Sequence, residues 1–416
     1  MMMFRKNVKW DKNIFLLIAL FLTNVFWILA VSLRNLSWTS PYRICAALDN
    51  FTQPVALIII IYAAVTRLDR TARFNLLRVA GIAVIVMLCL NSFISILSMF
   101  YDTWPFLQYF VVAADTGLAT GAVMEMAATM GRFSGIFNQP AEAGLAYSIG
   151  LLAWVYMAVT SKRINSIAWV SLILLIIGGS LSISKVFIIG GFSLSMLYWF
   201  WTVLSKKWLH IRKSTLFGGL ICVLAGVAGV SLLTESWIGL DFFLRLFDPG
   251  SINDEGVISL FTAGRFGAEE TSVKSLFAKT WNESPVIGFG VPLPDSGALD
   301  NAYIEFFIYG GIVGLTFYIA ILAVILRVAF RGLRTDPQLG MLLMALWILI
   351  IGVGIGVPVL TINRSSVLLW IILVITFGIL SKRRTSAIST SNSRFKEVPN
   401  GRETQQGCCL GQYSSL

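Results

Sequence analysis

Apolar runs of about 20 residues, separated by short polar segments, dominate this chain. A run of that length crosses about 30 Å of hydrocarbon as a helix, at a rise of 1.5 Å per residue. Ten runs are long enough, at about 13–33, 45–65, 76–99, 140–160, 166–184, 186–204, 215–234, 302–326, 339–357 and 363–380. The pattern therefore predicts an all-α polytopic membrane protein with about ten transmembrane helices.

The composition agrees with a lipid environment. Of the 416 residues, 57% are hydrophobic and 13% charged, and the mean hydropathy is +0.79. Water-soluble globular chains are considerably more polar. The first apolar run has no small-residue cleavage site before Arg34, so we expect it to stay in the protein as an anchor.

The positions of Lys and Arg predict the orientation, because basic residues collect in cytoplasmic segments. Most of them, 23 of 32, lie in alternate polar segments: the N-terminus, 66–78, 161–165, 205–214, 327–338 and the tail after 380. Both termini are therefore expected in the cytoplasm. This distribution also accounts for the net charge of +11 without a nucleic-acid partner.

Residues 105–126 form an eleventh apolar segment, although two cytoplasmic termini require an even number of spans. Asp115 and Glu125 would each cost roughly 3 kcal/mol at membrane depth. We therefore predict an interfacial or re-entrant segment within 101–138 on the outer side. An ordinary span, with 11 or 12 helices in total, remains the alternative.

The chain is expected to form one membrane domain, residues 1–380, with a large outer loop at 235–300. The tail at 381–416 is rich in Ser, Thr, Asn, Gln and Gly, and is predicted to be a disordered cytoplasmic segment.

A first candidate site on the outer side is the motif GRFSGIFNQPAEAG at 131–144. Pro140 suits the first turn of a helix, and Glu142 would lie in that turn, where the helix dipole favours an anion. A loop-to-helix cap explains the Gly, Pro and Glu residues. It does not require Arg132, Asn138 and Gln139 together, which favours a binding site.

A second candidate is the turn GGSLSISKVF, where Lys185 interrupts an apolar stretch of nearly forty residues. A cation at this depth needs a counter-charge or must extend to the lipid headgroups. Either simple extension to the headgroups or binding of a phosphate explains Lys185.

A third candidate is the end of the large loop, TAGRFGAEETSVKSLFAKTWNESPVIGFG, with Arg265 and Lys274. Its spacing predicts an amphipathic helix followed by a Gly-rich turn, with one apolar face formed by Val273, Leu276, Phe277 and Trp281.

The chain then re-enters the membrane with LDNAYIEFFIYGGIVG, which carries Asp300, Asn301, Tyr303 and Glu305. Asp300 and Asn301 equally fit a plain helix cap. Glu305 lies one turn deeper and is harder to explain as a cap.

The order of these motifs resembles the O-antigen polymerase and ligase superfamily of bacterial inner membranes. The likeness covers roughly residues 130–326, and the flanking spans agree only in hydrophobicity. It implies a membrane-embedded glycosyltransferase of the C-type fold, acting at the periplasmic face on glycans linked to undecaprenyl diphosphate. Polymerases transfer the growing glycan to the next lipid-linked repeat unit, whereas ligases transfer it to lipid A core.

In the ligases a histidine commonly precedes the asparagine of the re-entry motif. Asp300 occupies that position here, and the one histidine, His210, lies in a predicted cytoplasmic cluster. The resemblance therefore favours a polymerase of O-antigen or exopolysaccharide. A ligase, a flippase for lipid-linked oligosaccharides and a noncatalytic scaffold are the alternatives, although no repeated halves of a transporter are visible.

The resemblance also implies roles for the residues. The expected catalytic set is Arg132, Arg265, Asp300 and Glu305, and the expected substrate-binding set is Lys185, Asn138, Gln139, Glu142, Lys274, Asn301 and Tyr303. The family often has Arg at the position of Lys185, and Arg265 lies about one helical turn further from SPVIGFG than expected, which leaves Lys274 and Lys279 as substitutes. No cofactor or metal is expected. Membrane lipids and a chain-length regulator are the expected partners.

Overall fold

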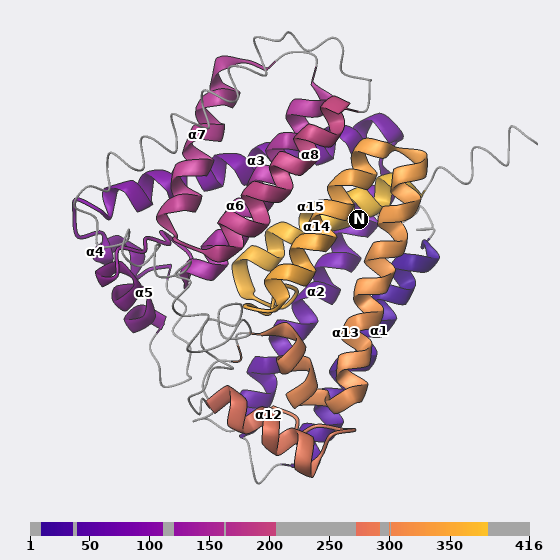
Figure 1. The fold of residues 1–416 in the computed structure, drawn as a ribbon. Helices are drawn as coiled ribbons and strands as arrows, with labels where there is room; N and C mark the ends of the chain where they lie inside the picture. The colour runs from indigo at the N-terminus through magenta and orange to yellow at the C-terminus, as the bar shows by residue number, and fades with distance from the viewer. Residues whose placement is uncertain are drawn as a thin grey trace, which may run out of the picture. The chain divides into compact units, whose positions relative to one another are not determined.

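The computed structural model describes residues 10–35, 40–110, 120–161, 164–204, 272–291, 299 and 301–381, and these residues contain helices but no strand. The first half contains α1 (Lys12–Arg34), α2 (Pro41–Arg67), α3 (Arg70–Leu97), α4 (Trp104–Leu107), α5 (Thr120–Thr129), α6 (Pro140–Thr160), α7 (Ser166–Leu181), η2 (Val186–Phe192) and α8 (Ser193–Leu204). The second half contains α12 (Ser272–Glu283), α13 (Ala302–Thr335), α14 (Pro337–Gly354) and α15 (Asn363–Ser381) (Figure 1).

Seven of the described helices are long and apolar enough to cross a membrane: α1, α2, α3, α6, α13, α14 and α15. Two shorter apolar helical segments, 166–181 and 186–202, correspond to two further predicted runs. The predicted run at 215–234 lies outside the described residues. The class of helical polytopic membrane protein is thus confirmed, and the count of ten spans stays a prediction.

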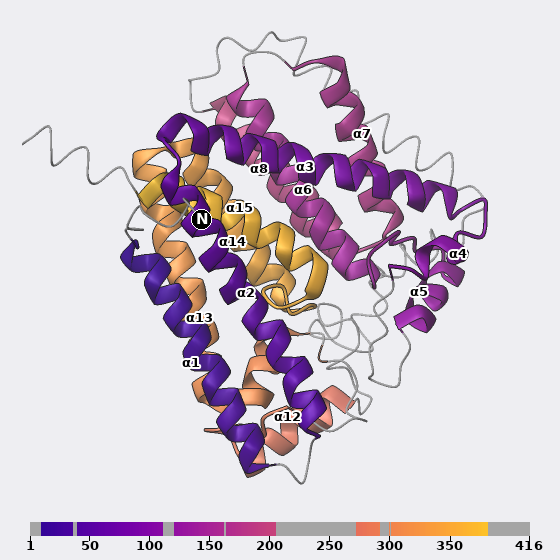
Figure 2. The same cartoon turned by 180° about the vertical axis from the view of Figure 1, so that it is seen from behind.

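Helix α6 lies at the centre of its neighbours and is buried along nearly its whole length. It packs against α3, α7, η2, α8 and α14, and α3 lies across α6 and α7 (Figure 2). Small residues permit this close packing: a Cβ on Gly144 would lie 2.5 Å from Ser184 Oγ, and one on Gly191 would lie 2.2 Å from Ser148 Oγ. Such close backbone approach is typical of helix association in lipid.

Helix α13 is broken at Gly311, whose φ of 63° is outside the helical range. The turn at 284–290 docks against the break through backbone hydrogen bonds. In each of the following pairs, the N–H of the first residue donates to the carbonyl oxygen of the second: Phe289 and Ile308, Gly290 and Tyr309, Ile312 and Pro285, and Val313 and Val286. Because the break leaves backbone groups of α13 without helical partners, this turn supplies hydrogen-bond partners for them.

The last turns of α1 support the same break. Trp27 Nε1 donates a hydrogen bond to Gly310 O at 3.0 Å, and Asn35 Nδ2 donates to Phe289 O at 3.0 Å. Ser32 Oγ accepts from Val291 N–H at 3.0 Å. The Gly-rich turn predicted from SPVIGFG is therefore held by two helices.

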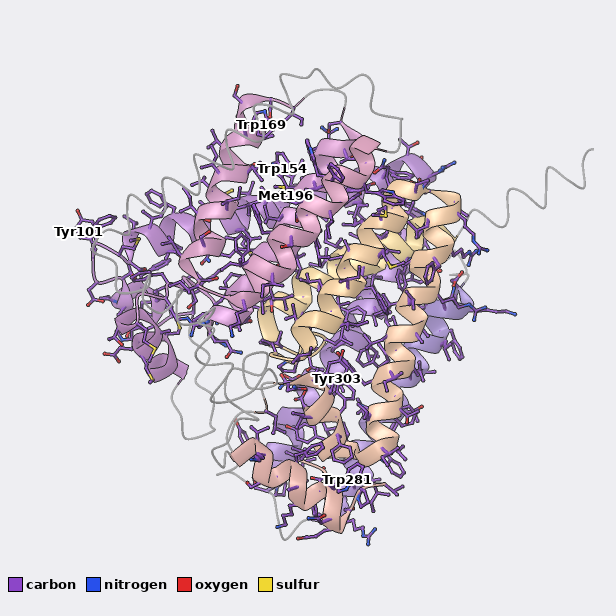
Figure 3. All side chains as sticks on the ribbon, viewed as in Figure 1. Tyr101, Trp154, Trp169, Met196, Trp281 and Tyr303 are labelled. Atoms are coloured by element: carbon purple, nitrogen blue, oxygen red, sulfur yellow. The ribbon has the colours of Figure 1, made fainter. Side chains whose placement is uncertain are left out.

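The segment predicted to be interfacial contains two short helices, α4 and α5, beyond the end of α3 (Figure 1). Residues 111–119 between them lie outside the described part of the chain. Aromatic side chains near α4, including Tyr101, Phe106 and Tyr109, are exposed. Tyr101 lies at the periphery (Figure 3). Such side chains are typical of the membrane interface, and the interfacial position stays a prediction.

Candidate functional site

The loop at 131–139, here called the GRFSG loop, begins where Gly131 ends α5. Gly131 has φ 71°, its N–H donates to Ala128 O, and the N–H of Arg132 donates to Ala127 O. This pair of bonds is the Schellman motif, which favours glycine at the left-handed position. The helix end thus fixes Arg132 as the first side chain of the loop.

Asn91 of α3 holds the middle of the GRFSG loop. Its Oδ1 accepts from Ile136 N–H at 2.7 Å, and its Nδ2 donates to Ser134 O at 3.2 Å and to Tyr147 Oη at 3.0 Å. A Cβ on Gly135 would lie 2.1 Å from Asn91 Oδ1, so a glycine is required there. We did not single out Asn91 from the sequence, and a polar residue within the apolar run at 76–99 was its only signal.

The GRFSG loop is joined to the turn that carries Lys185. Phe133 N–H donates to Leu181 O at 2.9 Å, and Arg132 Nη2 donates to Ile183 O at 3.4 Å. Ile183 has φ 41°, which is unusual for a β-branched residue. The structure therefore brings the first and second predicted sites together.

Both cations at this junction are partly removed from water. Burial lowers the pKa of Arg132 to about 10, and burial also lowers the pKa of Lys185. Arg132 therefore stays charged at pH 7. A desolvated cation gains more from an anionic ligand than an exposed cation does.

Arg132 lines a pocket of about 340 Å³ between α4, α5 and the GRFSG loop. Two acidic residues, Asp102 and Glu125, and the aromatic residues Tyr101 and Trp104 also line it. Arg132 thus faces a cavity of sufficient size for a small polar group, bordered by both charge signs.

Glu142 connects the GRFSG loop to the start of α15. It lies in the first turn of α6, which begins at Pro140 as predicted, and it is only 1% exposed. Its Oε2 accepts from Asn138 N–H at 3.1 Å and its Oε1 accepts from Arg364 N–H at 3.0 Å. Glu142 therefore joins the GRFSG loop to a residue 222 positions further along the chain than itself.

Arg364 is a cation at this site that our sequence analysis missed. Its guanidinium Nη1 donates to Ile136 O of the GRFSG loop. Its only signal was an arginine at the first turn of an apolar run, a position that is costly in lipid. Arg132 belongs to the GRFSG loop, and Arg364 bonds to that loop from α15.

Two other predicted residues of this region have different surroundings. Asn138 Oδ1 is buried and has no hydrogen-bond partner within the described part of the chain. Gln139 is the N-cap residue of α6, and its side chain makes no capping hydrogen bond. An unpaired buried oxygen of this kind is uncommon in folded proteins and calls for a hydrogen-bond donor.

The re-entry motif packs against the segment 355–364, which consists of the connection between α14 and α15 and the start of α15. Asn301 Oδ1 caps α13 by accepting from Ile304 N–H, and its Nδ2 donates to Ile355 O at 2.7 Å. Glu305 is buried, and its Oε2 accepts from Thr361 Oγ1 at 3.4 Å. The helix-cap interpretation of Asn301 is confirmed.

Tyr303, whose Oη donates to Ile351 O at 3.1 Å, lies near the start of α13 (Figure 3). Its hydroxyl therefore serves the contact between α13 and α14. Glu142 and Glu305 reach the 355–364 segment from different helices, so the first and third predicted sites share it.

Helix α12 has the predicted apolar face. Val273 is buried with Ile304 and Ile308, and Leu276 and Phe277 pack against them. Trp281 is 57% exposed, but its ring lies 6.1 Å from that of Phe307. The helix lies beside the start of α13 (Figure 1).

The structure describes some of the predicted charged residues of the large loop and not others. Lys274 lies half-buried on α12, and Lys279 Nζ is 5.7 Å from the centre of the Phe289 ring. Arg265 and Asp300 lie outside the described residues, so their predicted roles stay untested.

No known protein family, characterised protein or solved structure matches this chain. The functional argument therefore uses the chemistry of the described residues and the motif resemblance stated above.

Proposed function

We propose that this chain is a repeat-unit polymerase of the O-antigen or exopolysaccharide type, in a bacterial inner membrane. It would transfer a growing glycan from undecaprenyl diphosphate to the next lipid-linked repeat unit at the periplasmic face. The observation that carries the proposal is the GRFSG loop, which bonds to both the turn before Lys185 and the first turn of α15. Arg132, Lys185 and Arg364 are thereby anchored to one connected structure.

The transfer requires stabilisation of a leaving diphosphate. The bond between the sugar anomeric carbon and the diphosphate oxygen breaks, and the acceptor hydroxyl oxygen forms the new glycosidic bond. Negative charge develops on the diphosphate, which Arg132 and Arg364 would stabilise through charge-assisted hydrogen bonds. Arginine suits this task because its planar fork binds two phosphate oxygens.

The proton of the acceptor hydroxyl needs an acceptor group. We assign it to Asp300, with Glu305 as the reserve. Glu305 already accepts from Thr361 in the fold, which supports a positioning role for it. Asn138 Oδ1 would accept a hydrogen bond from a sugar hydroxyl.

Glu142 would act as a positioning residue. Its two oxygens bond to the backbone of Asn138 and of Arg364, so it fixes the spacing between the GRFSG loop and α15. A displacement of about 1 Å in such a support can lower a rate a hundredfold.

The test uses purified protein in bilayers that contain lipid-linked repeat units. We expect ladders of longer glycans with the native chain, and a loss of at least about a hundredfold in Arg132→Ala and Arg364→Ala. Arg34→Ala is the matched control, because Arg34 is an exposed arginine at the last turn of α1. The control should polymerise normally.

Other outcomes would contradict the proposal. Ladders that persist after Arg132→Ala and Asp300→Ala would remove the catalytic assignment. Transfer to lipid A core without ladders would indicate a ligase, and movement of lipid-linked units across the bilayer without elongation would indicate a flippase.

A further inference from the structure

One exposed face of α13 changes from apolar to basic along the helix. In order toward the last turn, the exposed residues of this face are Ile319, Ala323, Arg327, Phe330 and Arg334. They are three or four positions apart, and such residues lie on the same side of an α-helix. This face of α13 therefore carries aliphatic side chains first and guanidinium groups at its end.

Three arginines form the basic part of this face: Arg327, Arg331 and Arg334, here called the arginine stripe. They extend over about 10 Å of the helix axis, at a rise of 1.5 Å per residue. Arg331 Nη1 lies 4.0 Å from Asp11 Oδ2, and the Arg331 side chain is 31% exposed. Arg327 and Arg334 are exposed, and neither forms an ion pair with any residue that the structure describes. The stripe therefore presents more positive charge than this one carboxylate neutralises.

The start of α1 lies beside the arginine stripe. Asp11, which precedes α1, meets Arg331 near the end of α13, whereas Trp27 of α1 bonds to Gly310 nearer the beginning of α13. Helices α1 and α13 therefore run antiparallel and side by side (Figure 1).

Helix α1 adds charge and aromatic surface to this end of the helix pair. Lys12 is an exposed cation in its first turn, and Phe15 is 66% exposed. Residues 1–10 contain three basic residues and no acid. On α13, Phe330 is 55% exposed between two arginines of the stripe. Exposed aromatic side chains beside cations are typical of the headgroup level of a membrane.

Asp336 directly follows α13, but its carboxylate serves another part of the protein. Its Oδ1 accepts from Leu339 N–H at 3.4 Å and so caps α14. Its side chain lines a pocket with Asn75 of α3 and Tyr156 of α6. The group formed by the arginine stripe, Lys12 and Asp11 contains four cations and one acid, which gives it a net charge of +3 at pH 7.

We propose that the arginine stripe binds the phosphate of an anionic phospholipid, with phosphatidylglycerol as the probe. One acyl chain lies along the apolar part of the same face, over Ile319 and Ala323. Clusters of basic residues at the ends of membrane helices attract anionic lipids in this way, and arginine bonds strongly to phosphate oxygens. The site is independent of the proposed polymerase activity, since none of its residues belongs to that machinery.

The choice of lipid follows from charge. Phosphatidylglycerol carries a net charge of about −1 and no cation, so its headgroup complements the stripe. The headgroups of phosphatidylethanolamine and phosphatidylcholine carry an ammonium beside the phosphate, which the stripe and Lys12 repel. An acidic soluble protein would match the charge only, because it offers nothing to the exposed aliphatic part of the same face.

The test is native mass spectrometry of the full chain from bilayers with equal amounts of the three lipids. We expect the native protein to retain phosphatidylglycerol at least roughly fivefold over either other lipid, a difference of about 1 kcal/mol. Arg327→Gln and Arg334→Gln should each lower that retention by a similar factor, the effect of one basic residue near an anionic surface. The double variant should lower it further.

Asp11→Asn should change retention in the opposite direction. It removes the carboxylate beside Arg331, so phosphatidylglycerol should be retained more strongly than by the native chain. Asparagine also caps helices well, so α1 keeps its N-cap. A gain in retention separates the effect of charge from misfolding, which would only release lipid.

Arg34→Gln is the matched control, because Arg34 is an exposed arginine in the last turn of α1, at the opposite end of that helix from Asp11. It should retain phosphatidylglycerol nearly as the native chain does. Equal retention of the three lipids, equal losses in Arg327→Gln and Arg34→Gln, or a loss in Asp11→Asn would each overturn the proposal.

Discussion

Several single side chains in this protein each connect backbone segments that are far apart in sequence. Asn91 bonds to two backbone groups of the GRFSG loop, and Glu142 bonds to the backbone of that loop and of α15. Each is buried among helices, where water is not available to replace a lost partner. The geometry of the candidate site therefore depends on a few polar groups.

Glu142→Ala should destabilise the protein, because it leaves the N–H groups of Asn138 and Arg364 without their acceptors. Each buried donor left unsatisfied costs about 1–3 kcal/mol. Glu142→Gln keeps one oxygen and should cost about half as much. Thermal unfolding in detergent measures both, with Glu125→Ala as the control, because Glu125 is an exposed acid of α5. An unchanged melting temperature in Glu142→Ala would contradict the capping role.

Arg132→Met should change stability little, because relief of the desolvated charge offsets the lost hydrogen bond to Ile183 O, while it should abolish polymerisation. Burial lowers the pKa of Arg132 to about 10, below its ordinary value of 12.5, so the fold disfavours the charged form. That unfavourable contribution is present at all pH values below about 10, and it diminishes as the pH rises toward 12.5. Methionine is shorter than arginine but also has an unbranched, flexible side chain, and it carries no charge to desolvate.

The measurement combines the melting temperature at pH 7 with the ladder assay on the same sample. Arg34→Met, at an exposed position, should change neither quantity. A clear loss of stability in Arg132→Met would mean that Arg132 supports the fold and would weaken its functional assignment.

At the scale of elements, the main feature is that the break in α13 and the turn at 284–290 hydrogen-bond to each other. The sequence predicts a Gly-rich turn from SPVIGFG and a spanning run from 302–326, each from its own residues. The sequence does not predict that the turn and the helix bond to each other. Their hydrogen bonds join backbone atoms, which every residue type carries, so no pattern of side chains indicates the pairing. The run in fact continues to Thr335, because the polar last turn of α13 stays helical.

Gly311→Ala should destabilise the protein by at least about 2 kcal/mol. Its φ is 63°, which costs an alanine about 1–2 kcal/mol, and the added Cβ would lie 2.3 Å from the carbonyl of Val286. The turn should then detach from α13. Faster proteolysis at 284–290 and a lower melting temperature would register this change.

Gly352→Ala in α14 is the matched control. A Cβ there meets no atom within 4 Å, so alanine should be neutral or stabilise the helix by up to about 1 kcal/mol. Equal effects of the two substitutions would contradict a special role for the break.

At the scale of the whole molecule, hydrophobicity predicted most of the fold. Nine predicted runs coincide with helices in the part of the chain that the structure describes, because crossing a bilayer fixes both length and composition. The candidate site was predictable only in pieces. Arg364 and Asn91 were missed because their importance comes from contacts with residues 228 and 45 positions away.

The described helices also make the predicted orientation testable. Helix α8 ends near the start of α14, since Tyr198 Oη donates to Gln338 O, whereas α12 packs against the start of α13. The chain therefore leaves α8 at one end of the helices and returns at α12 at the other. This arrangement agrees with the single span predicted at 215–234, which lies outside the described residues.

Single cysteines in a cysteine-free background test this orientation in intact cells. Asp102→Cys and Ser275→Cys are exposed at the same end of the helices as the candidate site. They should react with a maleimide that crosses the outer membrane but not the inner membrane. Thr160→Cys, exposed at the other end, should react only after lysis. Because Lys and Arg resist translocation, the reverse pattern would contradict the basic-residue argument. It would also put the GRFSG loop in the cytoplasm and so exclude a periplasmic active site.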